Sequence, residues 1–514
     1  MRTLSVSRNL WSSGICGFLA AVLVAACGGG ESTTPKSSAA DISDIVAEDA
    51  GAGVTPFIRF VKLRGTSVAQ LDATRYTVAP KPGTASRPVD VEFNSAALIR
   101  RGYYTPGSGQ ATLPVFGLYA NHDNGVTITL RFKDGSSKLL TLSLQTAAYV
   151  DPVGIYDHAA VVTRRAVGST LGFDFIAIKS RLGAPVVIDT DGEIRWATTG
   201  FTDSTSSAFH DNAFFVGDAA STKTSRIDLD GTVSTSRLIA SDYTRYHHNI
   251  DIGKFGLLVE VDAQSVGVVN VEAILAEVTT SGAVIREWDF AKIIGDFMAS
   301  RGDDPAEFVR PGIDWFHMNA ATYDARDDSI IASSRENFVI KIDYRTSEII
   351  WILGDPTKYW YTFPSLRAKA LTLPTGDLYP IGQHAVSVTL DGLVLLFNDG
   401  LSSMHQPAGT SPGETRTFSA VSGYSIDLVT RTAREALHYE HTPSIFSDIC
   451  SSAYQSPDRS MLVNYSTSDS RTTATVTGLA PDRSTVFELK YQSPIPCSVS
   501  WNASPIAFDN LIFE

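Results

Sequence analysis

The stretch 187-VIDTDGEIRW-196 is the clearest copy of a unit that recurs along most of the chain. A β-rich run enters a polar turn that contains Asp and Gly, and a second run leaves the turn and ends in an aromatic residue. Because β-branched residues favour strands and Asp-Gly favours tight turns, the unit predicts a β-hairpin. Further copies with uneven spacing begin near Ile227, Thr280, Ile342, Ile426 and Ala480.

The spacing of these units predicts the fold class. Six turns over roughly 360 residues correspond to about 60 residues per unit, which fits four-stranded blades with long loops. We therefore predict an all-β fold with a six-bladed β-propeller over residues 151–514, with a large β-sandwich or a solenoid as the alternative. Helical patterns are few, and residues 291–300 form the best short candidate.

The segment before the propeller, residues 51–150, has a different pattern. Apolar and polar residues alternate at 58–61, 89–93 and 126–130, and clusters of Gly, Pro and Asn-Asp separate these runs. Short alternating strands divided by turn signals are typical of a small β-sandwich. We expect such a domain at residues 51–150.

The N-terminus has the features of a lipoprotein signal peptide over residues 1–26. Arg2 and Arg8 precede an apolar run, and small residues lead to Cys27. The run of about a dozen residues is too short to span a bilayer of ~30 Å. Cys27 is the expected lipidation site, and a secretory signal with a chance cysteine is the alternative. A flexible Gly/Ser/Thr-rich tether at 27–50 follows, so we expect a lipid-anchored chain on the periplasmic side, at the outer membrane.

The charge and the cysteines restrict the possible partners. The formal net charge is −13, and such an acidic surface argues against nucleic acid as a partner. A site for an anion must therefore be a local positive pocket. Outside the signal region and Cys27, the remaining cysteines are Cys450 and Cys497, which an oxidising compartment would allow to pair in a disulfide.

Three predicted strands begin with a histidine, at His248, His317 and His384. Strand starts on one rim of a propeller line the central channel, so three blades would bring these side chains together. His248 is preferred to His247 because His248 and His384 both precede their turn glycine by eight residues. A single histidine of this kind is usually structural, whereas three matched positions favour a functional site.

Arg335 ends a further predicted strand that pairs with the His317 strand through a turn at 324–328. This hairpin would return Arg335 to the rim that carries His317. The planar guanidinium donates to two oxygens at once, which suits an oxyanion; a surface ion pair is the alternative. Asn319 and His247 are the candidate substrate-binding residues beside these four.

Several segments resemble the signature of bacterial aryl-sulfate sulfotransferases. They are DWFHMN (314–319), DDSIIASSR (327–335), VIKID (339–343), IWILGDP (350–356), GQHA (382–385), FNDG (397–400) and MHQPA (404–408). PVFGLY (114–119) is similar to the N-terminal β-sandwich of that family. The resemblance covers most of the chain, is dense between residues 314 and 408, and is thin after 447.

The resemblance implies a six-bladed propeller that moves a sulfuryl group from an aryl sulfate to a phenol without a nucleotide donor. It implies a sulfated histidine at His384, with His317, His248 and Arg335 completing the site. It also implies small phenolic donors and acceptors as partners, no cofactor or metal, and a homodimer. Cys450 and Cys497 do not clearly match the cysteine pair of the family.

The chemistry of these side chains agrees with that activity. Sulfuryl transfer shares the demands of phosphoryl transfer, and a neutral imidazole is a competent nucleophile. We expect His384 to attack sulfur and Arg335 to hold the sulfonate oxygens together with His248 or His317. The remaining histidine would protonate the leaving phenolate and later deprotonate the acceptor.

Two other functions are compatible with the sequence. Three histidines can bind zinc in a metal-dependent hydrolase, although Arg335 is a poor neighbour for a dication and no carboxylate occupies the aligned strand starts. The chain could also be a non-enzymatic propeller lipoprotein that acts as a binding scaffold, because propellers host many functions. A pure scaffold has no need for the matched His-Arg set.

Overall fold

The computed structural model describes residues 42–265 and 267–514, and these are mostly strands. The expectation of an all-β propeller fold is confirmed. The predicted signal peptide, Cys27 and most of the tether lie outside the described residues. Within the described part of the chain, no helix is long and apolar enough to cross a membrane.

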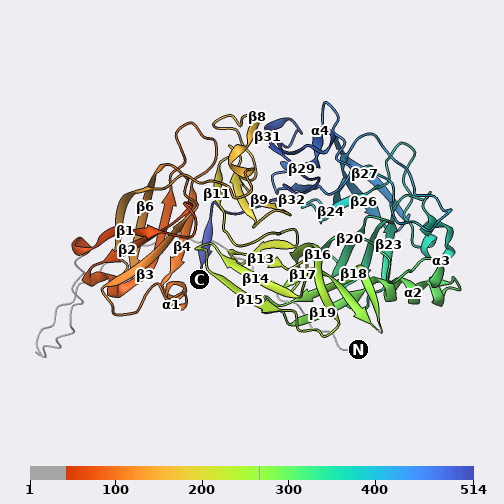
Figure 1. Cartoon of the computed structure of the whole chain (residues 1–514), viewed down its shortest axis with the longest axis horizontal. Coiled ribbons are helices and arrows are strands. Elements are labelled where there is room, and N and C mark those ends of the chain that lie inside the picture. Colours follow the sequence, from red (N-terminus) through yellow and green to blue (C-terminus); the bar gives the residue numbers. More distant parts are fainter. Residues whose placement is uncertain (1–41, 266) are drawn as a thin grey trace, which may run out of the picture. The chain divides into compact units, whose positions relative to one another are not determined.

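Between residues 160 and 506 the strands form six antiparallel sheets (Figure 1). The first sheet contains β9 (Phe175–Lys179), β10 (Val186–Asp189), β11 (Ile194–Trp196) and β32 (Asn502–Ile506), and the second contains β12 (Ser207–His210), β13 (Ala213–Gly217), β14 (Lys223–Asp228) and β15 (Val233–Arg237). The third contains β16 (Tyr243–Ile252), β17 (Leu257–Ser265), β18 (Val268–Val278) and β19 (Val284–Asp289), and the fourth contains β20 (Met318–Asp324), β21 (Ser329–Ser334), β22 (Val339–Asp343) and β23 (Ile349–Leu353). The fifth contains β24 (Gln383–Val388), β25 (Val394–Asn398), β26 (Ala420–Asp427) and β27 (Thr432–Glu440), and the sixth contains β28 (Ser452–Gln455), β29 (Met461–Thr467), β30 (Thr473–Leu479), β31 (Thr485–Gln492) and β8 (Ala160–Thr163).

The sheets surround a channel because the strands at one end of each sheet contact one another in succession. These strands, called the first strands below, are β12, β16, β20, β24, β28 and β32. β12 contacts β16, and the contacts continue through β20, β24 and β28 to β32. Side chains of β32 and β12 then line one cavity together, which completes the ring. Each sheet packs between two neighbours, so central strands such as β13, β21 and β29 are buried on both faces.

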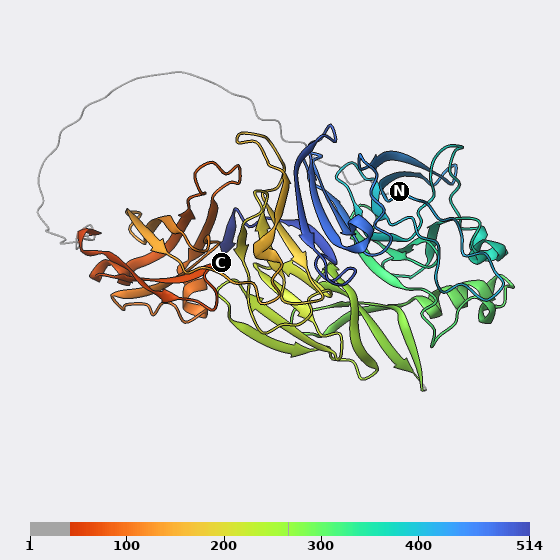
Figure 2. The same cartoon turned by 45° about the horizontal axis from the view of Figure 1, so that its top comes forward.

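Strands from opposite ends of the propeller sequence join in two of the sheets. β32 pairs antiparallel with β9, with Asn502 opposite Lys179 and Ile506 opposite Phe175. β8 pairs with the outer strand β31, and Figure 2 shows this yellow strand beside the blue ones. Backbone hydrogen bonds therefore hold the ring closed.

The N-terminal region contains two further sheets whose buried side chains share one hydrophobic core. They consist of β1 (Val46–Ala52), β2 (Ile58–Arg64) and β5 (Gln110–Phe116), and of β33 (Leu511–Phe513), β4 (Val89–Asn94), β3 (Leu71–Val78), β6 (Asp123–Phe132) and β7 (Ser137–Gln145). Burial alternates strictly along β6, so one face of its sheet packs on the core and the other faces solvent.

The last strand, β33, belongs to the N-terminal region and not to the propeller. It pairs parallel with β4, and the Phe513 ring stacks on Phe93 with centroids 4.3 Å apart (Figure 1). The sequence-based division placed this strand within 151–514. Its partner lies some four hundred residues earlier in the chain, and local patterns contain no information about such a pairing.

Helices are short and few. They are α1 (Ser95–Arg100), α2 (Phe290–Ser300), α3 (Pro364–Arg367) and α4 (Ser468–Arg471), with 3₁₀ turns at Ile42–Asp44, Thr66–Gln70, Tyr156–His158, Pro305–Glu307 and Tyr359–Thr362. α2 lies where the sequence predicted a helix, and the Asp289 carboxylate caps it by accepting from Lys292 N at 3.0 Å. α2 opens the long connection between β19 and β20 that ends at His317.

Candidate active site

The first strands of three consecutive sheets are irregular where the predicted histidines lie. His248 and His317 have φ values of 41° and 49°, and Ala385, next to His384, has φ 52°. The strand registers shift at the same places in β16, β20 and β24. Bulges re-aim side chains, and a left-handed non-glycine residue costs about 1–3 kcal/mol and is typical of functional sites. Three neighbouring blades are therefore deformed around one place.

His384 is held as a neutral imidazole with a defined tautomer. Its Nδ1 lies 2.8 Å from the carbonyl oxygen of Gly382. A carbonyl only accepts, so the proton is on Nδ1 and Nε2 keeps its lone pair. Burial, together with the charge of Arg335, lowers the pKa of His384 to about 3. His384 thus offers an unprotonated nitrogen throughout the physiological pH range.

Arg335 returns to the rim of His317 through the hairpin of β20 and β21. Met318 lies opposite Ser334, and the backbone N–H of Arg335 donates to the His317 carbonyl at 3.0 Å. The guanidinium, only 1% exposed, donates to Glu336 at 3.0 Å and to Asp399 at 3.2 Å. Its buried Nε makes no hydrogen bond with any described residue. The Nε–H of this cation is therefore available to bind a ligand oxygen.

His317 differs from the other histidines because two carboxylates face the same ring nitrogen. Nδ1 lies 2.5 Å from Asp314 Oδ2 and 3.1 Å from Glu272 Oε2. Burial alone would lower the pKa of His317, but the Glu272 and Asp314 carboxylates outweigh it and raise the pKa. His317 is therefore the histidine suited to hold and release a proton.

His248 and His317 are in ring contact, with centroids 4.5 Å apart. Burial lowers the pKa of His248 well below its ordinary value, and the neighbouring His317 adds to that effect. His247 lies behind His248, with the two Nδ1 atoms 3.2 Å apart, and faces Glu260 at 3.7 Å. The Trp501 ring lies 5.3 Å from the other side of His248.

The four predicted residues occupy one cluster. The rings of His248 and His317 are in contact, and the backbone N–H of Arg335 donates to the His317 carbonyl. Arg335 and His384 both face Asp399 Oδ2, at 3.2 and 3.9 Å. Distant parts of the sequence therefore meet at one place.

Asn319 braces the His384 strand. Its Nδ2 donates to the Gln383 carbonyl at 2.9 Å, while its buried Oδ1 has no hydrogen-bond partner among the described residues. The Gln383 amide in turn donates to the Ser334 carbonyl. Gln383, which sequence reasoning did not select, thus ties β24 to the end of β21, next to Arg335.

Carboxylates are the part of the site that sequence reasoning missed. Asp399 and Glu336 flank Arg335, and Asp314 and Glu272 flank His317. Three of the four lie within or beside the motif segments, so these motifs could have indicated them. Glu272 lies on β18, far from any of those segments, and no sequence pattern indicated it. Glu336 also orders the loop after β25, since Oε2 accepts from Met404 N at 2.8 Å and from His405 N at 2.7 Å.

The comparisons with known proteins agree with this geometry. A model described as Arylsulfotransferase (ASST) matches residues 162–502. The chain belongs to the arylsulfotransferase family. It is 24% identical over 345 residues to "Arylsulfate sulfotransferase AssT" of Escherichia coli O6:H1, covering 54% of this chain and 56% of that protein. The Lelliottia amnigena protein of the same name is 26% identical over 240 residues, which are 37% of this chain and 39% of that protein.

The aligned region thus spans about half the length of the E. coli protein and less of the other. Solved structures similar to this chain include the β-propeller domain of Myceliophteria thermophila Cps50 (Swd1), at 13% identity and a TM-score of 0.34, covering 65% of this chain and 89% of that one. The RRP9 WD40 repeats match at 8% identity and a TM-score of 0.31, covering 71% and 90%.

The sequence argument against a metal considered only the aligned strand starts, where no carboxylate lies. Carboxylates reach the histidines from other strands and loops. The groups His247, His248 and Glu260; His248, Glu272 and His317; and Asp314, His317 and His405 each place their ligand atoms within 4.8 Å of one another. The buried guanidinium of Arg335 and the proton on His317 Nδ1 nevertheless favour an anion over a cation.

The two cysteines within the described residues are paired. Cys450 and Cys497 form a disulfide with Cα atoms 6.2 Å apart. It joins the loop before β28 to the segment that leads to Trp501 and β32. The bond therefore fixes the chain that carries the aromatic ring beside His248.

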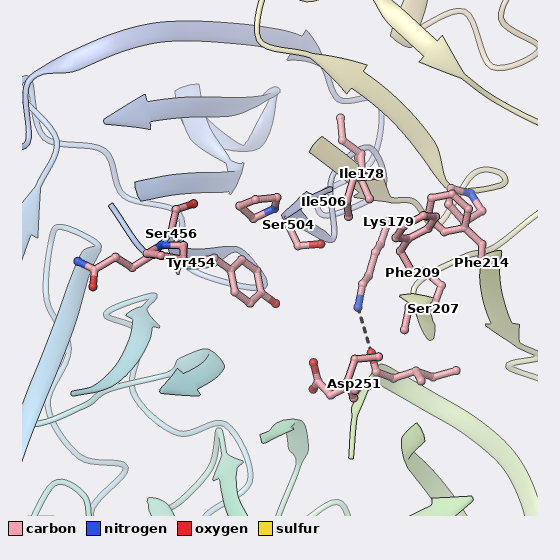
Figure 3. A pocket seen from close by; sticks show the side chains of 18 residues that line it. Ile178, Lys179, Ser207, Phe209, Phe214, Asp251, Tyr454, Ser456, Ser504 and Ile506 are labelled. Atoms are coloured by element: carbon pink, nitrogen blue, oxygen red, sulfur yellow. Dashed lines mark hydrogen bonds between the residues drawn. The ribbon is translucent and has the colours of Figure 1, made fainter. Parts of the chain in front are cut away.

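One cavity between the inner strands is lined by none of the four predicted residues. It has a volume of about 400 Å³ and apolar walls that include Phe209 and Phe214 (Figure 3). On its polar side, the buried Lys179 donates to the Ile250 carbonyl at 3.5 Å and to the Asn249 side chain. The cavity therefore borders the residue after His248 without sharing its chemistry.

Proposed function

We propose that this protein transfers a sulfuryl group from an aryl sulfate ester to a phenolic acceptor through a sulfohistidine at His384. The observation that carries the proposal is the pairing of a neutral His384, whose Nε2 has a free lone pair, with a buried Arg335 whose Nε–H has no hydrogen-bond partner among the described residues. A nucleophile beside an oxyanion donor is the minimum that sulfuryl transfer requires.

In the first half-reaction Nε2 of His384 attacks sulfur, and the bond between sulfur and the aryl oxygen breaks. The N–S bond forms as the phenolate leaves, while Arg335 and His248 donate to the sulfonate oxygens. His317 gives its proton to the phenolate, which departs as a phenol. In the second half-reaction an acceptor phenol returns a proton to His317 and takes the sulfuryl group from His384.

The surroundings suit an aromatic substrate and a labile intermediate. Trp501 offers an aryl face next to His248. The side chains of His384 and His317 are only 8% and 16% exposed. A sheltered site limits attack by water on the sulfohistidine, which favours transfer over hydrolysis.

The experiment is donor-dependent sulfation of a panel of phenols by the full chain, with 4-nitrophenyl sulfate as the donor. We expect ping-pong kinetics, and a sulfated peptide containing His384 when donor is supplied without acceptor. Mass spectrometry locates the adduct. Sequential kinetics, or an adduct on another residue, would contradict the proposal.

A metal-dependent hydrolase is the second candidate, because histidines and carboxylates cluster at the site. That function predicts bound metal in the purified protein, loss of activity on chelation, and free sulfate as product. Sulfuryl transfer predicts unchanged turnover after chelation and a sulfated phenol as product. Metal analysis combined with product analysis separates the two.

We also propose that lipidation of Cys27 holds the protein on the periplasmic side of the outer membrane. The support is the signal-like sequence of residues 1–26 and the small residues before Cys27. Membrane fractionation of the intact chain and of Cys27→Ser tests this, and we expect release of the variant. The homodimer implied by the resemblance stays a prediction, which light scattering of the purified chain can test.

A further inference from the structure

We propose that Glu272 is a positioning residue for proton transfer, which together with Asp314 holds the proton of His317 ready for the leaving phenolate. The inference rests on the proposed function and adds a residue that none of the motifs contains. Its basis is geometric: Glu272 Oε2 lies 3.1 Å from His317 Nδ1 and 3.4 Å from His248 Nδ1. One carboxylate oxygen therefore stands between two histidines of the site.

The backbone is shaped to place Glu272 there. β17 and β18 pair regularly up to Val261 opposite Ile274, and the register then shifts before Ala263 meets Asn270. Glu272 lies in this bulge with φ 51°. Its N–H donates to Asp262 at 2.9 Å, and Asp262 is itself held by Arg245 at 2.6 Å. A surface glutamate with only a structural role would not require a left-handed backbone that is anchored by a buried carboxylate.

The charges around Glu272 favour a shared proton. Burial raises the pKa of Glu272, and the nearby Asp314 and Asp262 carboxylates raise it further, whereas His317 and Arg245 oppose them. Glu272 Oε2 is buried and makes no hydrogen bond with any described residue. The 3.1 Å contact with His317 Nδ1 is therefore an ion pair, in which the charge of each group affects the titration of the other.

Groups on other elements also face His317, and they include the Glu336 carboxylate, whose pKa His317 lowers. Arg335 approaches from the end of β21, His384 from β24 and His405 from the loop after β25, where its ring centroid is 6.4 Å from that of His317. Arg335 lowers the pKa of His317, so the two carboxylates are what keep a proton on the pair. His317 and Glu272 then titrate together, with an apparent pKa that belongs to both.

The reaction requires a group on the enzyme that can release one proton and later regain it. The enzyme gives up one proton when the phenolate leaves as phenol, and it regains one when the acceptor phenol attacks the sulfohistidine. His317 passes the proton to and from the phenol oxygen. Glu272 stabilises the charged form of His317 before the first transfer. After the second transfer it stabilises the charged imidazole that the acceptor phenol has restored.

The test is Glu272→Gln, which keeps the size of the side chain and removes its charge and proton. We expect the alkaline limb of the kcat/KM profile to move to lower pH by about one unit or more, because a carboxylate at this range raises the pKa of a cation by that amount. Phenyl sulfate, which needs an acid for its leaving group, should lose about 10²-fold in turnover. 4-Nitrophenyl sulfate, whose phenolate leaves unaided, should lose less than about tenfold.

Two variants make the result specific. Glu272→Asp should recover part of the pH profile and of the ratio between the two donors. Glu348→Gln removes the same charge from an exposed turn and should match the wild type in both measurements. Equal losses with both donors and an unmoved alkaline limb in Glu272→Gln would overturn the proposal.

A second measurement does not depend on activity. The His317 imidazole can be titrated by NMR in protein with ¹⁵N-labelled histidines, with His317→Asn to assign its signals. Glu272→Gln should lower the observed pKa of His317; an unchanged titration would overturn the role of Glu272. Failure of the wild type to sulfate any phenol would instead count against the proposed function, and the titration would still decide the coupling.

Discussion

The two halves of the ring differ in the regularity of their first strands. β12, β28 and β32 keep an unbroken register with their partners. β16, β20 and β24 each contain a shift, and the predicted histidines lie on or directly before these strands. The regular half closes the ring through the pairing of β32 with β9, whereas the irregular half carries the chemistry. The register shifts of these six strands therefore occur where polar side chains must leave the sheet pattern and converge.

The largest effect is expected from His384→Asn in the irregular half, because it removes the nitrogen that accepts the sulfuryl group. Transfer should be abolished, and no sulfated peptide should form. The matched control is His210→Asn on β12 in the regular half, which should retain activity. Residual transfer by His384→Asn, measured with 4-nitrophenyl sulfate, would contradict the proposed nucleophile.

Arg335→Lys tests the oxyanion donor. Lysine keeps the charge but lacks the planar fork that lets one side chain donate to Glu336, to Asp399 and, through Nε, in a third direction, so kcat should fall by about 10²–10³-fold. Arg226→Lys, on β14 of the regular half, should leave kcat unchanged. Steady-state kinetics distinguish the two, and a loss in KM alone for Arg335→Lys would argue against a role in the transition state.

Removing the disulfide tests the contribution of the regular half to stability. Cys450→Ala with Cys497→Ala opens a link between residues 47 positions apart, which should lower the free energy of unfolding by about 2–4 kcal/mol. Because the link also fixes the chain before Trp501, KM for the aryl sulfate should rise more than kcat falls. Denaturant unfolding and steady-state kinetics check the two parts, and equal stability would show that the link is dispensable.

The pH dependence of stability should come mainly from the irregular half. The pKa of His384 is about 3 in the folded protein against an ordinary value of 6.5, so the unfolded chain takes up the proton first as the pH falls. Stability from this group is complete above pH 6.5 and is lost toward about pH 3, with a loss of about 2 kcal/mol by pH 5. Unfolding of His384→Asn should show a shallower pH dependence than that of His210→Asn.

The smallest effect separates the two kinds of strand directly. Ala453→Gly in the regular β28 should cost about 1 kcal/mol or more, because glycine adds backbone freedom and loses a buried methyl group. Ala385→Gly replaces a residue with φ 52°, so relief of the left-handed strain should offset most of that cost. Urea unfolding of both variants measures the difference, and equal losses would contradict strain at Ala385.

The sequence was sufficient for those parts of the site that follow local periodicity. Alternation after His384 and the turn between the strands ending at Asp324 and beginning at Ser329 predicted strand starts and the hairpin that returns Arg335. Glu272 could not be predicted, because its direction depends on a bulge opposite Asp262 and not on the alternation of β18. The pairing of β33 with β4 was missed for a related reason, since no local pattern identifies a partner so distant in the chain.

The contribution of β32 to the sheet of β9 also affects how the chain can fold. The ring cannot close until Asn502, more than three hundred residues after Lys179, is available to pair with it. At roughly 5–20 residues per second, synthesis of the intervening chain takes tens of seconds. Four of the sheets can form from contiguous strands during that interval, but the site remains open to water until the C-terminal strands arrive. A sheltered active site can therefore form only after the polypeptide is complete.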